Sequence, residues 1–312
     1  MLLIISGCQQ AASGFSITLG GDIMLARAGA PIFEMDGVGV DPWRELRQQG
    51  VLDVEDDYFM ANLESPLGDV GSSAGDMNLC GTPSEASILT LAQLDLVTLA
   101  NNHDNDCGGQ GAIQTAAILE KNGILSVGEA FQPVFLDTPQ GRVAVLAAQD
   151  VTGDLNEDTL LRAVAEVSEK ASLVIVSIHW GNEYQAGPDE RQQTLAQRLA
   201  DAGADVIWGH HPHVLQKVEF LEASDGRKVL VLYSLGNLLA DQWILEDAQR
   251  SALVRLTFGN LQVSGIEVIP IRLDRESRTL QVADDAQSIV SRLRVSDLTE
   301  IPVNIFSVSG TE

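Results

Sequence analysis

All five histidines of the chain directly follow short apolar runs that indicate buried β-strands. They are His103, His179, His210, His211 and His213. Two carboxylates, Asp22 and Glu64, also stand just after predicted strands. Because ligands bind at the carboxyl ends of the strands in open α/β sheets, we expect these side chains to share one site. A lone histidine is usually structural, but this joint placement favours a common function.

Imidazole and carboxylate groups together are suited to Zn, Mn or Fe. His211 and His213 are two residues apart, so both side chains point to the same side of an extended segment. They can then reach one ion or two adjacent ions, and two metals about 3.5–4 Å apart can hold the attacking and leaving oxygens of a hydrolysed ester. The sequence therefore predicts a divalent metal site with one or two ions (Mn, Zn or Fe).

Other catalytic signatures are weaker or missing. Ser234 lies in a Tyr-Ser-Leu-Gly segment without the flanking glycines of a GxSxG elbow. The chain has no P-loop and no GxGxxG dinucleotide loop. Its three cysteines include no CxxC pair, so their spacing does not indicate a metal site.

Alternating strands and helices would position the candidate ligands. Predicted strands cover 15–19, 58–63, 95–100, 142–148, 172–178 and 204–208, and predicted helices cover 84–93, 109–121, 157–170 and 188–202. Further strands at 228–233, 251–258 and 261–273 follow without a long helix between them. This order predicts a layered α/β protein with two sheets. We expect one domain over 15–275 and a C-terminal appendage over 276–312.

The chain is strongly acidic. Its 312 residues include 19 Lys plus Arg against 44 Asp plus Glu, a net charge of −25. Nucleic acid is excluded as a partner, because its binding requires a cationic surface. Solubility or adaptation to a salty habitat would explain the charge, and a bound metal cation could reverse its sign locally for an anionic substrate. No run of about 18 apolar residues occurs, so no transmembrane helix is predicted.

Six motifs occur in a fixed order along residues 15 to 245. They are Gly21-Asp-Ile-Met-Leu25, Asn62-Leu-Glu-Ser-Pro66, Ala100-Asn-Asn-His-Asp104, Ser177-Ile-His-Trp-Gly-Asn-Glu183, Gly209-His-His-Pro-His-Val214 and Tyr233-Ser-Leu-Gly-Asn237 with Asp241-Gln242. This set resembles the CapA-type capsule-synthesis family, also called the poly-γ-glutamate biosynthesis family. Such proteins look like relatives of the calcineurin-like metallophosphoesterases. The resemblance implies their fold, a four-layer α/β/β/α sandwich.

The resemblance also implies roles for individual residues. The implied metal ligands are Asp22, Glu64 (in place of a bridging aspartate), Asn102, His179, His211 and His213. His103, next to Asn102, is the implied general acid. Met24 stands where a histidine is expected, so one of two metal positions would be weak, hold a different ion or be empty. The residues expected to orient ligands through hydrogen bonds are Asp104, Glu183, His210, Asn237 and Asp241.

Simpler structural roles remain open for several of these residues. Asp22 could close a turn after two glycines, and Glu64 could be a solvated strand end. Asn101 and Asn102 could stabilise a left-handed loop through their side chains rather than bind metal. Glu183, Asp104 and Asp241 could instead be ordinary surface residues, and Asp106 is expected to be structural.

The N-terminal residues 1–14 resemble a truncated lipoprotein signal. Ile5-Ser6-Gly7-Cys8 would be its processing box, and Cys8 the lipid-bearing residue, although the segment lacks a basic region. The alternative is a leader on a cytosolic protein. With Cys8 lipidated, Cys80 and Cys107 remain as a candidate disulfide in an oxidising compartment, or as two reduced thiols in the cytosol. We expect the protein to be exported and either anchored by lipid or held in the cell envelope. The alternative is a cytoplasmic protein.

Two classes of function fit the resemblance. The first is a metal-dependent hydrolase that acts on a phosphoester or on an amide-like bond of an anionic envelope polymer. The second is a non-catalytic polymer-handling or export component of a capsule-synthesis membrane complex, with a vestigial or structural metal site. The presence of His103 favours the hydrolase, because a vestigial site has no need of a general acid.

Overall fold

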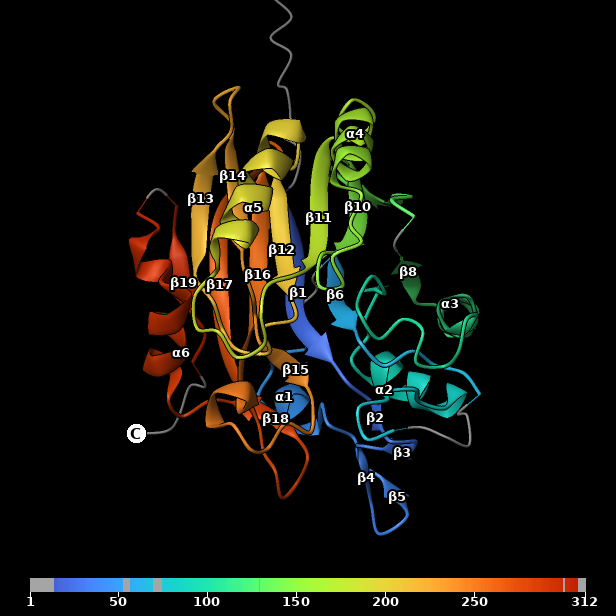
Figure 1. The fold of residues 1–312 in the computed structure, drawn as a ribbon. Coiled ribbons are helices and arrows are strands. Elements are labelled where there is room, and N and C mark those ends of the chain that lie inside the picture. Colours follow the sequence, from blue (N-terminus) through green and yellow to red (C-terminus); the bar gives the residue numbers. More distant parts are fainter. Residues whose placement is uncertain (1–13, 53–56, 70–74, 129, 300, 308–312) are drawn as a thin grey trace, which may run out of the picture.

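The computed structural model describes residues 14–52, 57–69, 75–128, 130–299 and 301–307, and its larger sheet is mixed (Figure 1). The strands of this sheet are β1 (Phe15–Ile23), β6 (Tyr58–Leu63), β7 (Leu96–Thr98), β8 (Leu125–Val127), β15 (Asn237–Leu239), β16 (Arg250–Gly259), β17 (Gln262–Leu273), β18 (Leu280–Val282) and β19 (Val303–Ile305). The order is β18-β17-β16-β1-β6-β7-β8, with β15 paired to β1 and β19 paired to β17. The four strands β1, β6, β7 and β8 are parallel, so their carboxyl ends lie at one edge.

The smaller sheet has a parallel centre with antiparallel edges. Its strands are β9 (Val134–Thr138), β10 (Gly141–Gln149), β11 (Leu173–His179), β12 (Val206–His210), β13 (Val218–Glu222) and β14 (Lys228–Leu232). The order is β13-β14-β12-β11-β10-β9, and within this sheet β9 and β13 run antiparallel to their neighbours. Every residue of β11 is buried, as expected for a parallel strand covered on both faces.

Helices complete four layers. The outer face of the larger sheet packs against α1 (Arg44–Gln48), α2 (Ala86–Leu91) and α3 (Gly111–Lys121). The outer face of the smaller sheet packs against α4 (Glu157–Ser168) and α5 (Glu190–Ala202), which lie in front of it in Figure 1. The expected α/β/β/α sandwich is therefore confirmed. Among the described residues, no helix has the length and apolar character needed to cross a membrane.

The alternation of side chains along the strands builds two separate cores. In β10, Val143 and Val145 face the larger sheet and belong to the same apolar cluster as Ile17 of β1. The intervening residues Ala144 and Leu146 face α4 and α5 instead. Because strand side chains alternate between the two faces, each apolar strand fills the inter-sheet core and a helix-covered core at once.

Short elements and capping details complete the chain. The hairpin strands are β2 (Ala26–Arg27), β3 (Ala30–Pro31), β4 (Glu34–Met35) and β5 (Val38–Gly39), and the 3₁₀ helices are η1 (Pro83–Glu85), η2 (Glu246–Gln249) and η3 (Val295–Asp297). The predicted helix 84–93 is thus η1 followed by α2. Helix α5 is capped at its N-terminus by Asp189, whose side chain accepts a hydrogen bond from the Gln192 N–H, and at its C-terminus by Gly203 with φ +117°.

The segment expected to form an appendage is built into the sandwich. Strands β18 and β19 pair with β17, which extends the larger sheet. Helix α6 (Ala286–Leu293) places Ile289 and Leu293 in the inter-sheet core. At the other end of the chain, residues 1–13, with Cys8 and the predicted leader, lie outside the described residues.

Candidate metal centre

The carboxyl ends of strands from both sheets meet at one place. Asp22 lies near the end of β1, and Glu64 follows β6 directly. His179 and His210 are the last residues of β11 and β12, and they pair in register. The two sheets are fixed to each other close by, since the Trp208 indole N–H donates to the Gly20 carbonyl oxygen at 3.0 Å. The fold therefore brings together residues that are far apart in the sequence.

The glycine before Asp22 allows β1 to approach a neighbouring segment closely. A Cβ atom on Gly21 would stand 1.9 Å from the Gly236 carbonyl oxygen. That carbonyl accepts a hydrogen bond from the Asp22 N–H at 3.0 Å. Any side chain at Gly21 would push β1 outward and move the Asp22 carboxylate with it, so this glycine belongs to the construction of the site.

The Asp22 carboxylate contacts side chains from both sheets. Its Oδ1 accepts a hydrogen bond from Asn62 Nδ2 at 2.8 Å and lies 3.3 Å from His210 Nδ1. Its Oδ2 accepts the His211 backbone N–H at 3.2 Å and lies 3.2 Å from His213 Nδ1. Neither ring nitrogen makes a hydrogen bond within the described part of the chain. The two imidazoles thus lie next to the Asp22 carboxylate without a hydrogen bond to it.

Glu64 is fully buried and unsatisfied. Neither of its carboxylate oxygens has a hydrogen-bond partner among the described residues. Its Oε1 lies 3.5 Å from His179 Nε2 and 3.9 Å from His213 Nδ1. His179 Nε2 lies 2.8 Å from Asn102 Oδ1 on its other side. A buried carboxylate without partners is costly, and a bound cation removes that cost.

The spacing of these atoms fits a shared cation. Oxygen and nitrogen atoms that ligate one tetrahedral ion at about 2.0–2.2 Å lie about 3.4 Å apart. The pairs between Asp22 or Glu64 and the histidines, at 3.2, 3.5 and 3.9 Å, are close to that value. Two triplets have ligand atoms within 4.8 Å of one another, and both include His213. The triplets are Asp22–Glu64–His213 and Glu183–His211–His213.

Burial shifts the protonation of three groups in the centre. It raises the pKa of the Glu64 carboxyl well above its usual range and lowers the pKa of the His179 imidazole well below its usual range. Burial, followed by the charge of His213, lowers the pKa of His211 to about 4. His179 and His211 are therefore neutral at pH 7, which is the form that binds metal.

The pKa values of Asp22 and His213 shift in the direction opposite to the one that burial alone would cause. Burial alone would raise the pKa of Asp22, but the imidazoles of His210 and His213 hold it well below its usual range. Burial alone would lower the pKa of His213, but the Glu64 and Asp22 carboxylates raise it to about 9. Without metal the two groups form an internal ion pair, whose proton an incoming cation would displace.

His103 lies beside the centre on the loop after β7. Its Nδ1 lies 2.9 Å from Asp106 Oδ2, and its backbone N–H donates to Asn101 Oδ1 at 3.0 Å. The same Asp106 oxygen accepts the Leu79 N–H at 2.6 Å. The Nε2 atom of His103 has no hydrogen bond within the described chain, and its side chain is 14% exposed. The ring is thus held at one nitrogen and available at the other.

A disulfide joins the two segments that hold this ring. Cys80 and Cys107 are bonded, with their Cα atoms 5.0 Å apart. Cys80 follows Leu79, and Cys107 follows Asp106, so the covalent link flanks the hydrogen bond between those two residues. The disulfide therefore restrains the segment that orients His103.

The residues expected to orient ligands have varied contacts. His210 contacts Asp22, and Glu183 belongs to the second triplet. Asp241 accepts both of its hydrogen bonds from Arg27 Nε, at 2.7 and 3.0 Å. Asp104 bonds to its neighbour Asn105. Asn237 donates to Gln242 and Ala248, with none of the proposed ligands among its partners.

Two residues have a larger part in the site than the sequence suggested. Asn62 Nδ2 lies between Asp22 Oδ1 and His179 Nδ1, 3.4 Å from the latter, and links one ligand from each sheet. Asn62 stands two residues before Glu64, which directly follows β6, so the strand period continued by one residue could have revealed it. Asp106, expected to be structural, contacts His103. The position of Asp106, three residues after His103, did not indicate this contact in the sequence.

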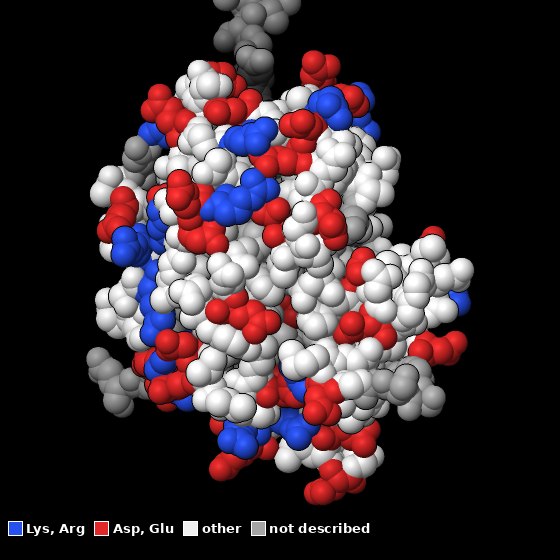
Figure 2. Space-filling view, in the orientation of Figure 1, with Lys and Arg blue, Asp and Glu red and all other residues white. Residues whose placement is uncertain are grey.

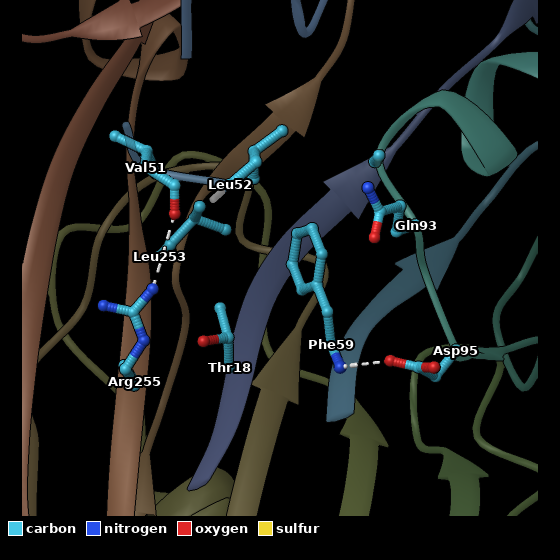
Figure 3. Close-up of a pocket in the computed structure, with 9 residues that line it drawn as sticks. Thr18, Val51, Leu52, Phe59, Gln93, Asp95, Leu253 and Arg255 are labelled. Carbon is cyan, nitrogen blue, oxygen red and sulfur yellow. Dashed lines mark hydrogen bonds between the residues drawn. The ribbon is translucent and has the colours of Figure 1, made fainter. Parts of the chain in front are cut away.

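A separate cavity of about 140 Å³ lies on the outer face of the larger sheet (Figure 3). It is lined by residues that include Thr18, Phe59, Leu253 and Arg255. Its polar groups have structural bonds, such as Phe59 N–H to Asp95 Oδ2 at 2.7 Å and Arg255 Nη2 to the Val51 carbonyl oxygen at 3.4 Å. Its lining contains no histidine, and the strand-end cluster remains the candidate for chemistry.

Solved structures share this fold. A hypothetical protein from Thermus thermophilus matches with a TM-score of 0.53 and 17% identity, over 82% of this chain and 98% of that one. A novel phosphatase from Mycoplasma pneumoniae matches with a TM-score of 0.52 and 12% identity, over 84% of this chain and 94% of that one. The fold class is metallophosphoesterase-like α/β.

The family follows from sequence comparison. The model of the bacterial capsule synthesis protein family PGA_cap matches residues 16–242. The chain belongs to this family, as its six motifs predicted.

The names of its relatives agree with this. Capsule biosynthesis protein CapA of Bacillus anthracis is 29% identical over 296 residues, covering 84% of this chain and 68% of the relative. PGA biosynthesis protein CapA of Bacillus subtilis strain 168 is 29% identical over 268 residues, covering 78% of this chain and 68% of the relative. A probable polyglutamine synthesis accessory protein of Mycobacterium tuberculosis is 27% identical over 269 residues, covering 72% of this chain and 69% of the relative.

Proposed function

We propose that this protein is a metal-dependent hydrolase of the cell envelope that acts on an anionic polymer or phosphoester in capsule or poly-γ-glutamate metabolism. One observation carries the proposal. The fully buried carboxylate of Glu64 has no hydrogen-bond partner in the described chain, and histidines from the other sheet lie within 3.9 Å of it. Such a cluster is unfavourable unless a cation binds there.

The proposed ligands are the six residues at the strand ends. They are Asp22, Glu64, Asn102, His179, His211 and His213. When bound, a divalent ion supplies Lewis-acid polarisation of the substrate and lowers the pKa of bound water. The donor set suits Mn, Zn and Fe alike, since all three ions accept imidazole and carboxylate ligands.

His103 supplies the proton in this proposal. Asp106 accepts a hydrogen bond from Nδ1, which fixes the tautomer and leaves Nε2 as the nitrogen that faces outward. A protonated Nε2 can then donate to the leaving group as its bond to phosphorus or carbon breaks. Asn101 holds the loop by donating from Nδ2 to the Leu63 carbonyl oxygen at 2.9 Å, directly before Glu64.

The proposed location is outside the cytoplasm. Disulfides persist in oxidising compartments, and the Cys80–Cys107 bond supports export. Lipid anchoring at Cys8 would then place the sandwich at the membrane surface, beside the partners of a capsule-synthesis complex.

The second candidate function is non-catalytic handling or export of the polymer. Met24, in place of a ligand histidine, favours this alternative, because an incomplete centre could be structural. A panel of phosphomonoesters, phosphodiesters and γ-linked glutamate oligomers, assayed with Mn, Zn and Fe, separates the two. Metal-dependent turnover of any of them supports the hydrolase, whereas metal binding without turnover supports the alternative.

Replacement of His103 by alanine is expected to lower turnover by about 10²–10⁴-fold and to leave the metal content unchanged. The reason is that its Nδ1 is bonded to Asp106, and its Nε2 is outside the proposed ligand set. Asn102→Ala, one residue earlier, is the matched control and should lose metal as well as turnover. Loss of bound metal from His103→Ala would identify His103 as a ligand and overturn its role as an acid.

Replacement of Asp106 by asparagine should lower turnover by about 10–100-fold. The change keeps the shape of the side chain but removes the carboxylate that bonds to the ring of His103. The loss should be greatest for substrates with poor leaving groups, which depend most on protonation. Asp104→Asn, on the same loop but bonded to Asn105, serves as the control. Equal losses for good and poor leaving groups would assign Asp106 a structural role only.

A further inference from the structure

Glu183 lies next to two of the proposed histidine ligands, although it comes from a different loop. It stands four residues after the end of β11, in the loop that leads to α5. A carboxylate oxygen of Glu183 and one ring nitrogen each of His211 and His213 lie within 4.8 Å of one another. Donor atoms bound to one ion are at most about 4.4 Å apart. Because the Glu183 side chain is exposed, a small rotation is enough to bring it to an ion held by these histidines.

Backbone hydrogen bonds attach this loop to the segment that carries the histidines. The Tyr184 N–H, next to Glu183, donates to the carbonyl oxygen of Pro212 at 2.8 Å, and Pro212 separates the two histidines. The Trp180 N–H donates to the His210 carbonyl oxygen at 3.1 Å. Glu183 is therefore held beside the histidine segment by contacts on both sides of its own position.

The two histidines have the conformation and burial expected of ligands. His211 and His213 have φ values of +92° and +57°, in the left-handed region that residues other than glycine rarely adopt. Both rings are almost fully buried, and neither Nδ1 has a hydrogen bond within the described chain. Their ring centres are 5.6 Å apart. Two imidazoles that bind one tetrahedral ion have ring centres roughly 5 Å apart, so this pair can share an ion.

The donor set itself is one that binds catalytic metals. Two imidazoles and one carboxylate hold zinc in catalytic sites and leave a further position for water or substrate. The same set, with open positions, also holds iron. Met24 stands where the family resemblance expects a ligand histidine, which removes one donor from the centre. Glu183 restores the number of donors and adds a negative charge.

We propose that Glu183 is a direct ligand of a divalent ion, which it binds together with His211 and His213 on the solvent-facing side of the centre. This inference rests on the proposed function, whose ligand set it extends. His213 also belongs to the triplet with Asp22 and Glu64, so the two positions are adjacent. Asp22 and Glu64 are fully buried whereas Glu183 is exposed, so a substrate reaches the position beside Glu183 first.

General attraction of cations to an acidic surface is the competing explanation for any effect of Glu183. The chain has a net charge of −25, and acidic side chains are spread over much of the viewed face (Figure 2). Salt screens such attraction between exposed charges. A matched control therefore removes the same charge elsewhere on the surface. Glu190, an exposed residue in the first turn of α5, provides it.

Calorimetric titration of the metal-free protein with Mn²⁺ or Zn²⁺, at low and at high salt, tests the inference. Glu183→Gln should weaken metal binding by about 10–100-fold at both salt concentrations. Glu190→Gln should bind metal as the wild type does. Saturation with Co²⁺ gives a second readout, because the visible absorption of this ion depends on its ligands. The Co²⁺ spectrum should change in Glu183→Gln and stay the same in Glu190→Gln.

Several results would overturn the inference. Unchanged metal affinity of Glu183→Gln, with metal bound to the wild type, would show that Glu183 is not a ligand and would leave the proposed function intact. A weaker affinity with an unchanged Co²⁺ spectrum would assign Glu183 the orienting role only. A loss that disappears at high salt, or that Glu190→Gln shares, would assign the effect to surface charge. No bound metal in the wild type would overturn the proposed function together with the inference.

Discussion

Replacement of Glu64 by glutamine is expected to weaken binding of Mn or Zn by about 100-fold or more. Both oxygens of this carboxylate are buried without hydrogen bonds in the described chain, and histidines from the opposite sheet approach one of them. Glutamine keeps the volume but cannot supply a negatively charged ligand. Calorimetric titration of the metal-free protein measures the change, and the thermal stabilisation by metal should shrink with it.

Asp205→Asn is the matched control for this prediction. Asp205 is a half-buried carboxylate of the smaller sheet, but it precedes β12 and bonds to the Val174 N–H and to Arg227, at the strand end opposite the centre. Its replacement should lower stability and leave metal affinity unchanged. If Glu64→Gln binds metal as tightly as the wild type, Glu64 is not a ligand and the centre is wrongly assigned.

Loss of the Cys80–Cys107 disulfide is expected to lower the free energy of unfolding by about 3–4 kcal/mol. The bond closes a loop with a sequence separation of 27 residues. Its removal returns that loop entropy to the unfolded chain, which gives the stated magnitude in the chain-entropy model. Denaturant titration of wild type and of the double variant Cys80→Ala, Cys107→Ala measures the difference.

Reducing conditions provide the internal control for the disulfide. A dithiol reductant should destabilise the wild type to the level of the double variant and leave the variant itself unchanged. Turnover should fall when the bond is lost, because Asp106, which contacts the His103 ring, accepts a hydrogen bond from the Leu79 N–H beside the disulfide. Two free thiols in the purified, unreduced protein would contradict this account.

Much of the fold was predictable because buried parallel strands have an unmistakable composition. The apolar run before His179 and the strand 58–63 were both located, since neither face of such strands meets water. The ends of these strands then located the histidines and both carboxylates. Parallel pairing brings the proposed ligands of each sheet to one edge, and the packing of the two sheets against each other brings both sets together.

Other features depend on contacts that no local pattern records. The three-residue strand β15 exists because Asn237 and Leu239 pair with β1, and its sequence has no independent strand signal. The C-terminal segment was expected to stand apart, but its short strands pair with β17. Asp106 gains its importance only from its contact with His103. Sequence separation of 214 residues hides the pairing of Arg27 with Asp241.

Anomalous diffraction from crystals soaked in Mn²⁺ is the most direct test of the central claim. The account predicts a Mn peak where the strand ends of the two sheets meet, about 2.0–2.3 Å from donor atoms of Glu64 and of other residues among the six proposed ligands. A Mn peak elsewhere on the protein, or none at this edge under saturating Mn²⁺, would contradict the assignment of this cluster as a metal centre.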